Sequence, residues 1–126
     1  MQKKENERLS QVRKSLAELA EEIDALLRIF TDRSRMVKGT VYEQRRKCGK
    51  PTCYCASGKP HASMMLSRSE EGRTKLSPIA LEQAEDLQVL TERYQNFRRA
   101  RARLGQIYKR MIELIDQLEA ARRKEP

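Results

Sequence analysis

The sequence has little of what builds a thick globular core or a membrane span. Tryptophan is absent, aromatic residues make up 5% of the 126 residues, and charged residues (36%) nearly equal hydrophobic ones (38%). No run approaches the ~18 apolar residues that a membrane helix needs, and the opening MQKKENERLS lacks the apolar segment of a signal peptide. We therefore expect one elongated, mainly helical domain in the cytoplasm, with no membrane contact.

The sequence also lacks the residue sets of common catalytic motifs. With a single histidine there is no second imidazole, and neither a Walker loop nor a G-x-G-x-x-G segment occurs. The zinc deaminase pattern, H-x-E followed by P-C-x-x-C, is missing as well. We expect a protein that is not an enzyme and that has no catalytic residues.

Cysteine is scarce, and all three cysteines stand with the only histidine in one stretch, CGKPTCYCASGKPH. An odd number of cysteines in a cytoplasmic protein disfavours disulfides. Three thiolates and one imidazole are a common structural zinc set, and the intervening Gly and Pro residues let the chain turn back around one ion. The predicted ligands of a structural zinc ion are Cys48, Cys53, Cys55 and His61.

Other uses of this cluster stay open, because its spacing departs from the usual C-x2-C pairs. An iron-sulfur cluster, another metal, a redox pair or reduced thiols in a surface turn are the alternatives. Zinc is favoured because the surrounding segment has few apolar side chains, whereas metal binding can supply on the order of 10 kcal/mol of folding free energy. Four ligands leave no open position for catalysis.

Two long segments have the apolar spacing of coiled-coil helices. From Leu9 to Phe30 the apolar residues alternate in steps of three and four, and Gly39 is the expected stop. The second helix is expected to begin at Ser77 and Pro78, and its seam is Leu87, Leu90, Tyr94, Phe97, Arg101, Leu104, Tyr108, Met111, Ile115 and Leu118. Between the helices, extended pieces around Gly72 predict a short hairpin.

The predicted fold is mainly α: an antiparallel two-helix coiled-coil hairpin with a small zinc-stapled head that contains a short β-hairpin. Residues 1–38 form the first stalk helix, 39–77 the zinc-binding basic head, and 78–123 the second stalk helix. A register that starts at the head puts Phe30 near Leu87.

The C-terminal half of the second helix has more apolar residues than one seam uses. An uncovered face of this width predicts self-association as a dimer or docking to a larger protein, with a frayed, ordinarily exposed helix end as the alternative. The expected association face is Ile107, Met111, Ile112, Leu114, Ile115 and Leu118.

The net charge of +9 is concentrated in two regions, +6 in residues 38–77 and +5 in 98–126, whereas 78–97 carries −3. Basic regions of this kind are typical of surfaces that bind phosphates, although solvated helix faces can have the same composition. The predicted nucleic-acid contacts are Arg45, Arg46, Lys47, Lys50, Lys59, Arg68, Arg73, Lys75, Arg98, Arg99, Arg103, Lys109 and Arg110. Tyr42 and Tyr54 either stack on a base or form the core of the head.

The cysteine stretch resembles an uncharacterised family of small basic bacterial and archaeal proteins with a core C-G-K-P-x-C-x-C-A-x-G-x-x-H. The matching residues are CGKPTCYCASGKPH and the preceding Gly39-Thr40-Val41-Tyr42, and the resemblance covers mainly residues 39–77. After His61 the segment ASMM replaces the Gly-Pro-aromatic run of that family. The resemblance implies the ligand set and an association with mobile elements or regulation, but no settled activity.

These patterns together predict a non-enzymatic, zinc-stabilised DNA-binding accessory or regulatory protein. The alternative is a coiled-coil adaptor that binds a larger protein such as a recombinase, transposase or nuclease. RNA is not distinguished from DNA, because no base-reading code can be extracted from the basic residues.

Overall fold

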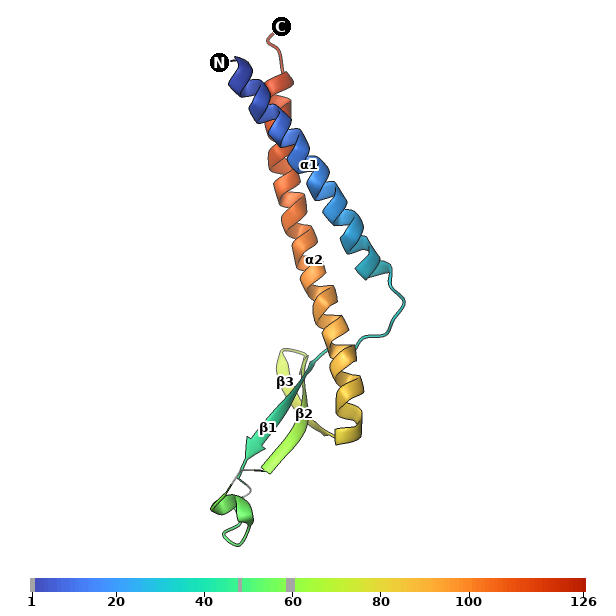
Figure 1. Ribbon diagram of the computed structural model, residues 1–126, viewed down its shortest axis with the longest axis vertical. Helices are drawn as coiled ribbons and strands as arrows, with labels where there is room; N and C mark the ends of the chain where they lie inside the picture. Colours follow the sequence, from blue (N-terminus) through green and yellow to red (C-terminus); the bar gives the residue numbers. More distant parts are fainter. Residues whose placement is uncertain (1, 48, 59–60) are drawn as a thin grey trace. The chain divides into compact units, whose positions relative to one another are not determined.

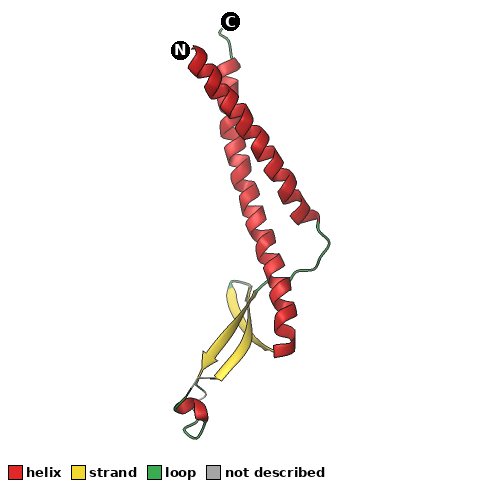
Figure 2. Ribbon diagram, in the orientation of Figure 1, coloured by secondary structure: helices red, strands yellow, loops and turns green. Residues whose placement is uncertain are grey.

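A computed structural model describes residues 2–47, 49–58 and 61–126, without the side chain of Cys55. Figure 1 shows the elements in chain order and Figure 2 shows their types. They are α1 (Gln2–Thr31), β1 (Thr40–Arg46), the short 3₁₀ helix η1 (Tyr54–Ala56), β2 (His61–Glu70), β3 (Arg73–Ile79) and α2 (Leu81–Arg122).

The expected fold class is wrong, because the protein combines its two helices with a three-stranded antiparallel sheet in the order β1-β2-β3. The strand β1 pairs with β2 from Thr40 opposite Ser67 to Arg46 opposite His61, so the sheet extends well beyond a short hairpin. Backbone pairing and a small apolar face hold this region. Among the residues with described side chains, no group of three metal-ligating residues staples the head together.

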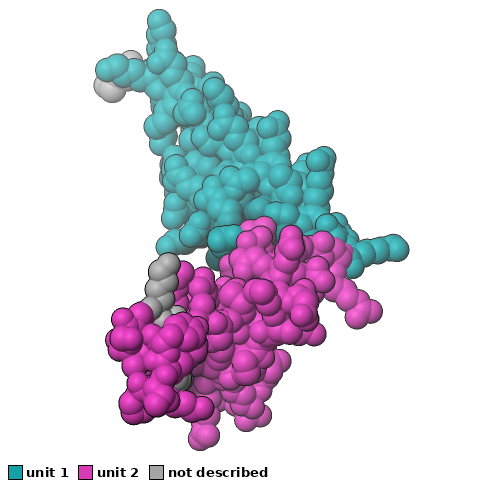
Figure 3. Space-filling view, turned by 60° about the horizontal axis from the view of Figure 1, so that its bottom comes forward, with its two compact units in different colours: residues 1–33, 97–126 teal, residues 34–96 magenta. Residues whose placement is uncertain are grey.

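The chain divides into two compact units, coloured separately in Figure 3. One unit comprises residues 1–33 and 97–126, and the other comprises residues 34–96. The helix α2 contributes to both.

In the first unit, α1 lies antiparallel to the second part of α2. The rings of Phe30 and Phe97 meet edge to face with centroids 5.2 Å apart, and Figure 1 shows both chain termini at the opposite end of this unit. We expected Phe30 to lie near Leu87, but its observed partner, Phe97, lies ten residues further along α2. The reason is that α1 already ends at Thr31, whose hydroxyl donates to the Leu27 carbonyl at 2.8 Å, and not at Gly39.

The buried residues of α2 are not all those of the expected seam. In its C-terminal half, one residue in each heptad is buried one position before the residue that the seam predicted inside. Ile107 is fully buried and Leu114 is 2% exposed, whereas Tyr108 and Ile115, which the seam predicted inside, are 57% and 50% exposed. Both stripes alternate in steps of three and four, so spacing alone could not choose between them. The charged Arg101 is accordingly exposed and lies outside the core.

In the second unit, one face of the sheet carries a small apolar patch. Val41 and Leu66 are paired across β1 and β2, and each is 8% exposed. Gly39 precedes β1 with φ 151°, and a Cβ there would lie 2.7 Å from the Ser67 carbonyl oxygen. Only glycine fits this close approach of the two strands.

The turn between β2 and β3 is the one expected around Gly72. Glu71 and Gly72 both have positive φ, as a two-residue type I′ hairpin turn requires. Ser77 and Pro78, by contrast, belong to β3, and α2 begins at Leu81. Because β3 is an edge strand, Pro78 can lie there without removing a needed ladder hydrogen bond.

Polar contacts connect α2 to the segment before the sheet. The amide of Val37 donates to the Leu90 carbonyl at 3.1 Å, and the side-chain amide of Gln95 donates to the Gly39 carbonyl at 3.3 Å. None of the helices, as far as the chain is described, is long and apolar enough to cross a bilayer.

Candidate functional site

The connection from β1 to β2 places Cys53, Tyr54 and His61 side by side. A turn closes where the Cys53 amide donates to the Lys50 carbonyl at 3.1 Å, and η1 follows directly. The Cys53 Sγ atom lies 3.1 Å from His61 Nε2. Cys53 and His61 are eight residues apart in sequence, and their side chains meet where the β1–β2 loop joins β2.

The other ring nitrogen of His61, Nδ1, lies within hydrogen-bonding distance of the Tyr54 hydroxyl. Tyr54 Oη lies 3.1 Å from His61 Nδ1, and the two rings meet edge to face with centroids 5.0 Å apart. A metal-binding histidine commonly hydrogen-bonds through its other nitrogen in this way, which fixes its tautomer and orientation. Nε2 and the Cys53 sulfur, 3.1 Å apart, are close enough to be two ligands of one ion.

The structure brings together two of the four predicted ligands, Cys53 and His61. Cys48 and Lys59, a predicted phosphate contact, lie outside the described residues, as does the side chain of Cys55. The donor chemistry of the described pair, one soft sulfur and one imidazole, fits zinc.

Four of the predicted phosphate contacts share one face of the sheet. Paired residues of neighbouring strands point to the same face, so Arg45, Arg68, Arg73 and Lys75 lie on the face of Val41 and Leu66. Arg46, paired with His61, lies on the other face.

Carboxylates neutralise several of these cations. Glu43 pairs with Arg45 at 3.1 Å, and Glu70 pairs with Lys75 at 2.9 Å and with Arg68 at 3.7 Å. All are exposed or half-exposed, where an ion pair contributes about 0–1 kcal/mol. In the described part of the chain no ion pair forms with Arg46, Lys47 or Lys50, which stand at the loop next to Tyr54 and His61.

The arginine-rich stretch of α2 has mixed roles. Arg103 donates from two guanidinium nitrogens to the Glu22 carboxylate, the contact from Nη2 measuring 2.8 Å. These hydrogen bonds lower the pKa of Glu22 and raise that of Arg103. Arg110 pairs with Glu113 on its own helix at 3.2 Å, and Arg98, Arg99 and Lys109 are exposed along the same stretch.

Tyr54 is a site residue that the sequence left undecided between core and stacking surface. It is 67% exposed, whereas Tyr42 is half-buried in β1. The surrounding Gly and Pro residues, which exclude a helix or strand core, were the signal that could have placed Tyr54 on the surface.

The expected association face is split by the structure. Ile107 and Leu114 are buried inside the first unit, and Met111 and Leu118 are half-buried. Ile112 and Ile115 are exposed together with Tyr108, which the expected face did not include.

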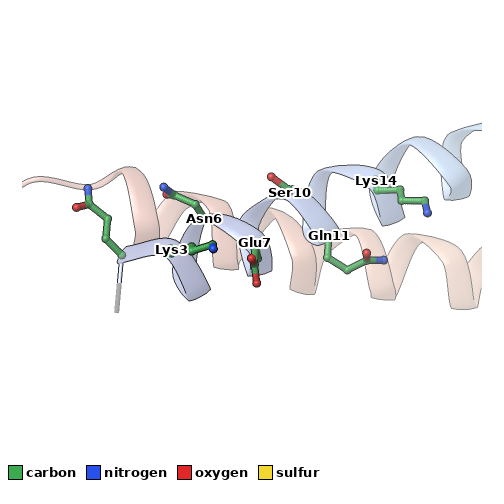
Figure 4. Close-up of a pocket in the computed structure, with 7 residues that line it drawn as sticks. Lys3, Asn6, Glu7, Ser10, Gln11 and Lys14 are labelled. Carbon is green, nitrogen blue, oxygen red and sulfur yellow. The ribbon is translucent and has the colours of Figure 1, made fainter.

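A shallow hollow near the start of α1 offers no comparable site. Its lining is Gln2, Lys3, Asn6, Glu7, Ser10, Gln11 and Lys14. Figure 4 shows that these polar side chains come from one helix, so no second element converges on the hollow.

Over residues 3–89, which is more than half of the chain, the sequence matches the family described as a domain of unknown function (DUF6788). No curated protein and no solved structure matches it.

Proposed function

The chain belongs to the family described as a domain of unknown function (DUF6788), and we propose that it is a non-enzymatic DNA-binding accessory or regulatory protein of the cytoplasm. Its phosphate contacts come from the β1–β2 loop with the adjoining sheet and from the arginine-rich stretch of α2. A structural zinc ion in the loop, held by Cys48, Cys53, Cys55 and His61, completes the proposal.

The observation that carries this proposal is the composition of the β1–β2 loop. Between Gln44 and Ser69 the sequence contains no carboxylate, while Arg46, Lys47 and Lys50 are exposed there. The exposed ring of Tyr54 contacts His61, which pairs with Arg46 across the two strands. Cations beside an exposed aromatic ring are the combination that binds a phosphate backbone and stacks on a base or sugar.

The zinc ion in this proposal orders the loop and performs no chemistry. All four proposed ligands lie between Cys48 and His61 in the sequence, so the effect of the ion is expected in the β1–β2 loop and on the orientation of His61. An ordered loop would present its cations to phosphates without a further entropy cost on binding.

A second candidate function is that of an adaptor for a larger protein such as a recombinase, transposase or nuclease. The exposed apolar residues Tyr108, Ile112 and Ile115 in the C-terminal half of α2 favour it. An association with mobile elements, as the cysteine motif implies, fits either candidate.

Fluorescence anisotropy with a labelled nonspecific duplex at about 50 mM salt tests the proposal, because multiple phosphate contacts are strongest at low salt. We expect binding that weakens in the triple variant Arg46→Ala, Lys47→Ala, Lys50→Ala. The matched control, Lys3→Ala, Lys4→Ala, Lys14→Ala on α1, removes the same charge and should bind as the wild type does. The absence of any binding would refute the DNA function, and competition by RNA of equal length would decide between the nucleic acids.

A further inference from the structure

The second part of α2 carries a second, exposed heptad pattern beside its buried one. Tyr108, Ile112 and Ile115 are 57%, 58% and 50% exposed and follow each other in steps of four and three. The same alternation continues outward to Gly105 and Arg101 on one side and to Glu119 on the other. We call Arg101, Gly105, Tyr108, Ile112, Ile115 and Glu119 the outer seam. Apolar residues at this spacing are what one helix of a coiled coil presents to another.

Gly105 shows that the outer seam leaves room for a partner side chain. The residue lies inside α2, where glycine weakens a helix relative to alanine. A Cβ at this position would meet nothing within 4 Å, so packing within the chain does not require glycine. The open space can accept a side chain from a partner helix.

We propose that two copies of the chain associate antiparallel along the outer seam. In this arrangement Tyr108 packs on Ile112 of the partner copy, Gly105 receives the partner copy's Ile115, and Arg101 meets the partner copy's Glu119. Each step of three or four along one helix is matched by an equal step backward along the other. The pairing is therefore self-complementary, as a two-fold interface between identical subunits must be.

Charge decides the orientation. In a parallel pair Arg101 would face Arg101 and Glu119 would face Glu119, whereas the antiparallel pair replaces both repulsions by two attractions. Glu119 already pairs with Arg123 at 3.6 Å. Both side chains of this pair are exposed, so Glu119 can pair with Arg101 of the partner copy instead. The half-buried Leu104, Met111 and Leu118 lie along one edge of the seam and widen its apolar area.

This proposal goes beyond the proposed function and does not depend on DNA binding. Sedimentation velocity and light scattering on the full chain, without nucleic acid, measure it directly. The wild type should be dimeric at about 100 μM, a concentration at which a standard interface is occupied. Arg101→Glu and Glu119→Arg should each raise the dimer dissociation constant on the order of tenfold or more, since each creates two like-charged contacts.

Two combinations of these variants identify the antiparallel pairing. The double variant Arg101→Glu, Glu119→Arg restores both attractions within one homodimer, and an equimolar mixture of the two single variants restores them in a heterodimer. Lys124→Glu and Glu125→Arg, which change the charge equally beyond the end of α2, serve as controls and should leave the dimer unchanged. Circular dichroism confirms that each variant is folded.

A wild type that stays monomeric at about 100 μM would overturn the proposal, because the seam would then be covered by a different protein or by none. Single variants that dimerise as the wild type does, or a double variant that fails to recover, would overturn it equally. DNA binding is measured by fluorescence anisotropy and dimerisation by sedimentation. A chain that does not dimerise is therefore distinguished from one that does not bind DNA.

Discussion

Arg103 on α2 holds the carboxylate of Glu22 on α1 through two of its guanidinium nitrogens. The two residues lie 81 positions apart in sequence, and their pairing, together with the contact of Phe30 and Phe97, fixes the register of the helices. A predicted phosphate contact thus has a structural partner inside its own unit.

The ion pair makes stability depend on pH. Because the hydrogen bond from Arg103 lowers the pKa of Glu22 below 4.5, ionised Glu22 stabilises the folded state above this value, and the contribution is lost as the pH falls through the folded pKa. Glu22→Gln should therefore lower the melting temperature at pH 7, and this effect should be lost as the pH falls through the folded pKa of Glu22, where the wild-type carboxylate becomes protonated as well. Glu18→Gln on the same helix is the control. An equal loss of melting temperature in both variants would show that the loss does not come from the pair of Glu22 and Arg103.

The buried stripe of α2 predicts opposite outcomes for two isoleucines only five positions apart. Ile107→Ala should cost about 2–5 kcal/mol in free energy of unfolding, because the side chain is fully buried and its removal leaves a cavity. Ile112→Ala, at 58% exposure, should change the same quantity by less than about 0.5 kcal/mol. Urea unfolding of dilute protein compares them without a contribution from association. The reverse order would contradict the placement of Ile107 in the buried stripe and of Ile112 outside it.

The loop site predicts about one zinc ion per chain by elemental analysis. Cys53→Ser should release the ion, whereas Tyr54→Phe should retain it with roughly 10–100-fold weaker affinity, because it removes only the hydrogen bond to His61. Chelation should change the helical signal in far-ultraviolet circular dichroism little, since the proposed ligands lie outside α1 and α2. A Cys53→Ser variant with full metal content would show that the ligand assignment is wrong.

Local patterns predicted some elements well. The strict alternation from Leu9 to Phe30 places the partly buried face of α1 correctly, and the Gly72 turn joins β2 to β3 as expected. Strand pairing was not predictable, because β1 and β2 are separated by the cysteine loop and neither is apolar throughout. Ser77 and Pro78 have the chemistry of a helix start, but tertiary pairing places them in an edge strand.

The candidate site was predicted in composition more than in geometry. The clustering of Cys53 with His61 follows from their nearness in sequence, but the hydrogen bond from Tyr54 required the structure. Net charge revealed the basic regions. It could not show that Glu43 and Glu70 neutralise part of the sheet whereas, among the described residues, no ion pair forms with Arg46, Lys47 or Lys50, because ion pairs depend on which residues share a face.

If the loop cations contact phosphates, they must contribute to the salt dependence of duplex binding. The logarithm of the binding constant should fall linearly with the logarithm of the salt concentration. Replacing Arg46, Lys47 and Lys50 by alanine should make this slope shallower by about 0.9 for each phosphate that the variant no longer neutralises, roughly 2–3 in total. The α1 control, without Lys3, Lys4 and Lys14, should keep the wild-type slope. Equal slopes for the wild type and the loop variant would show that these cations do not contact phosphates.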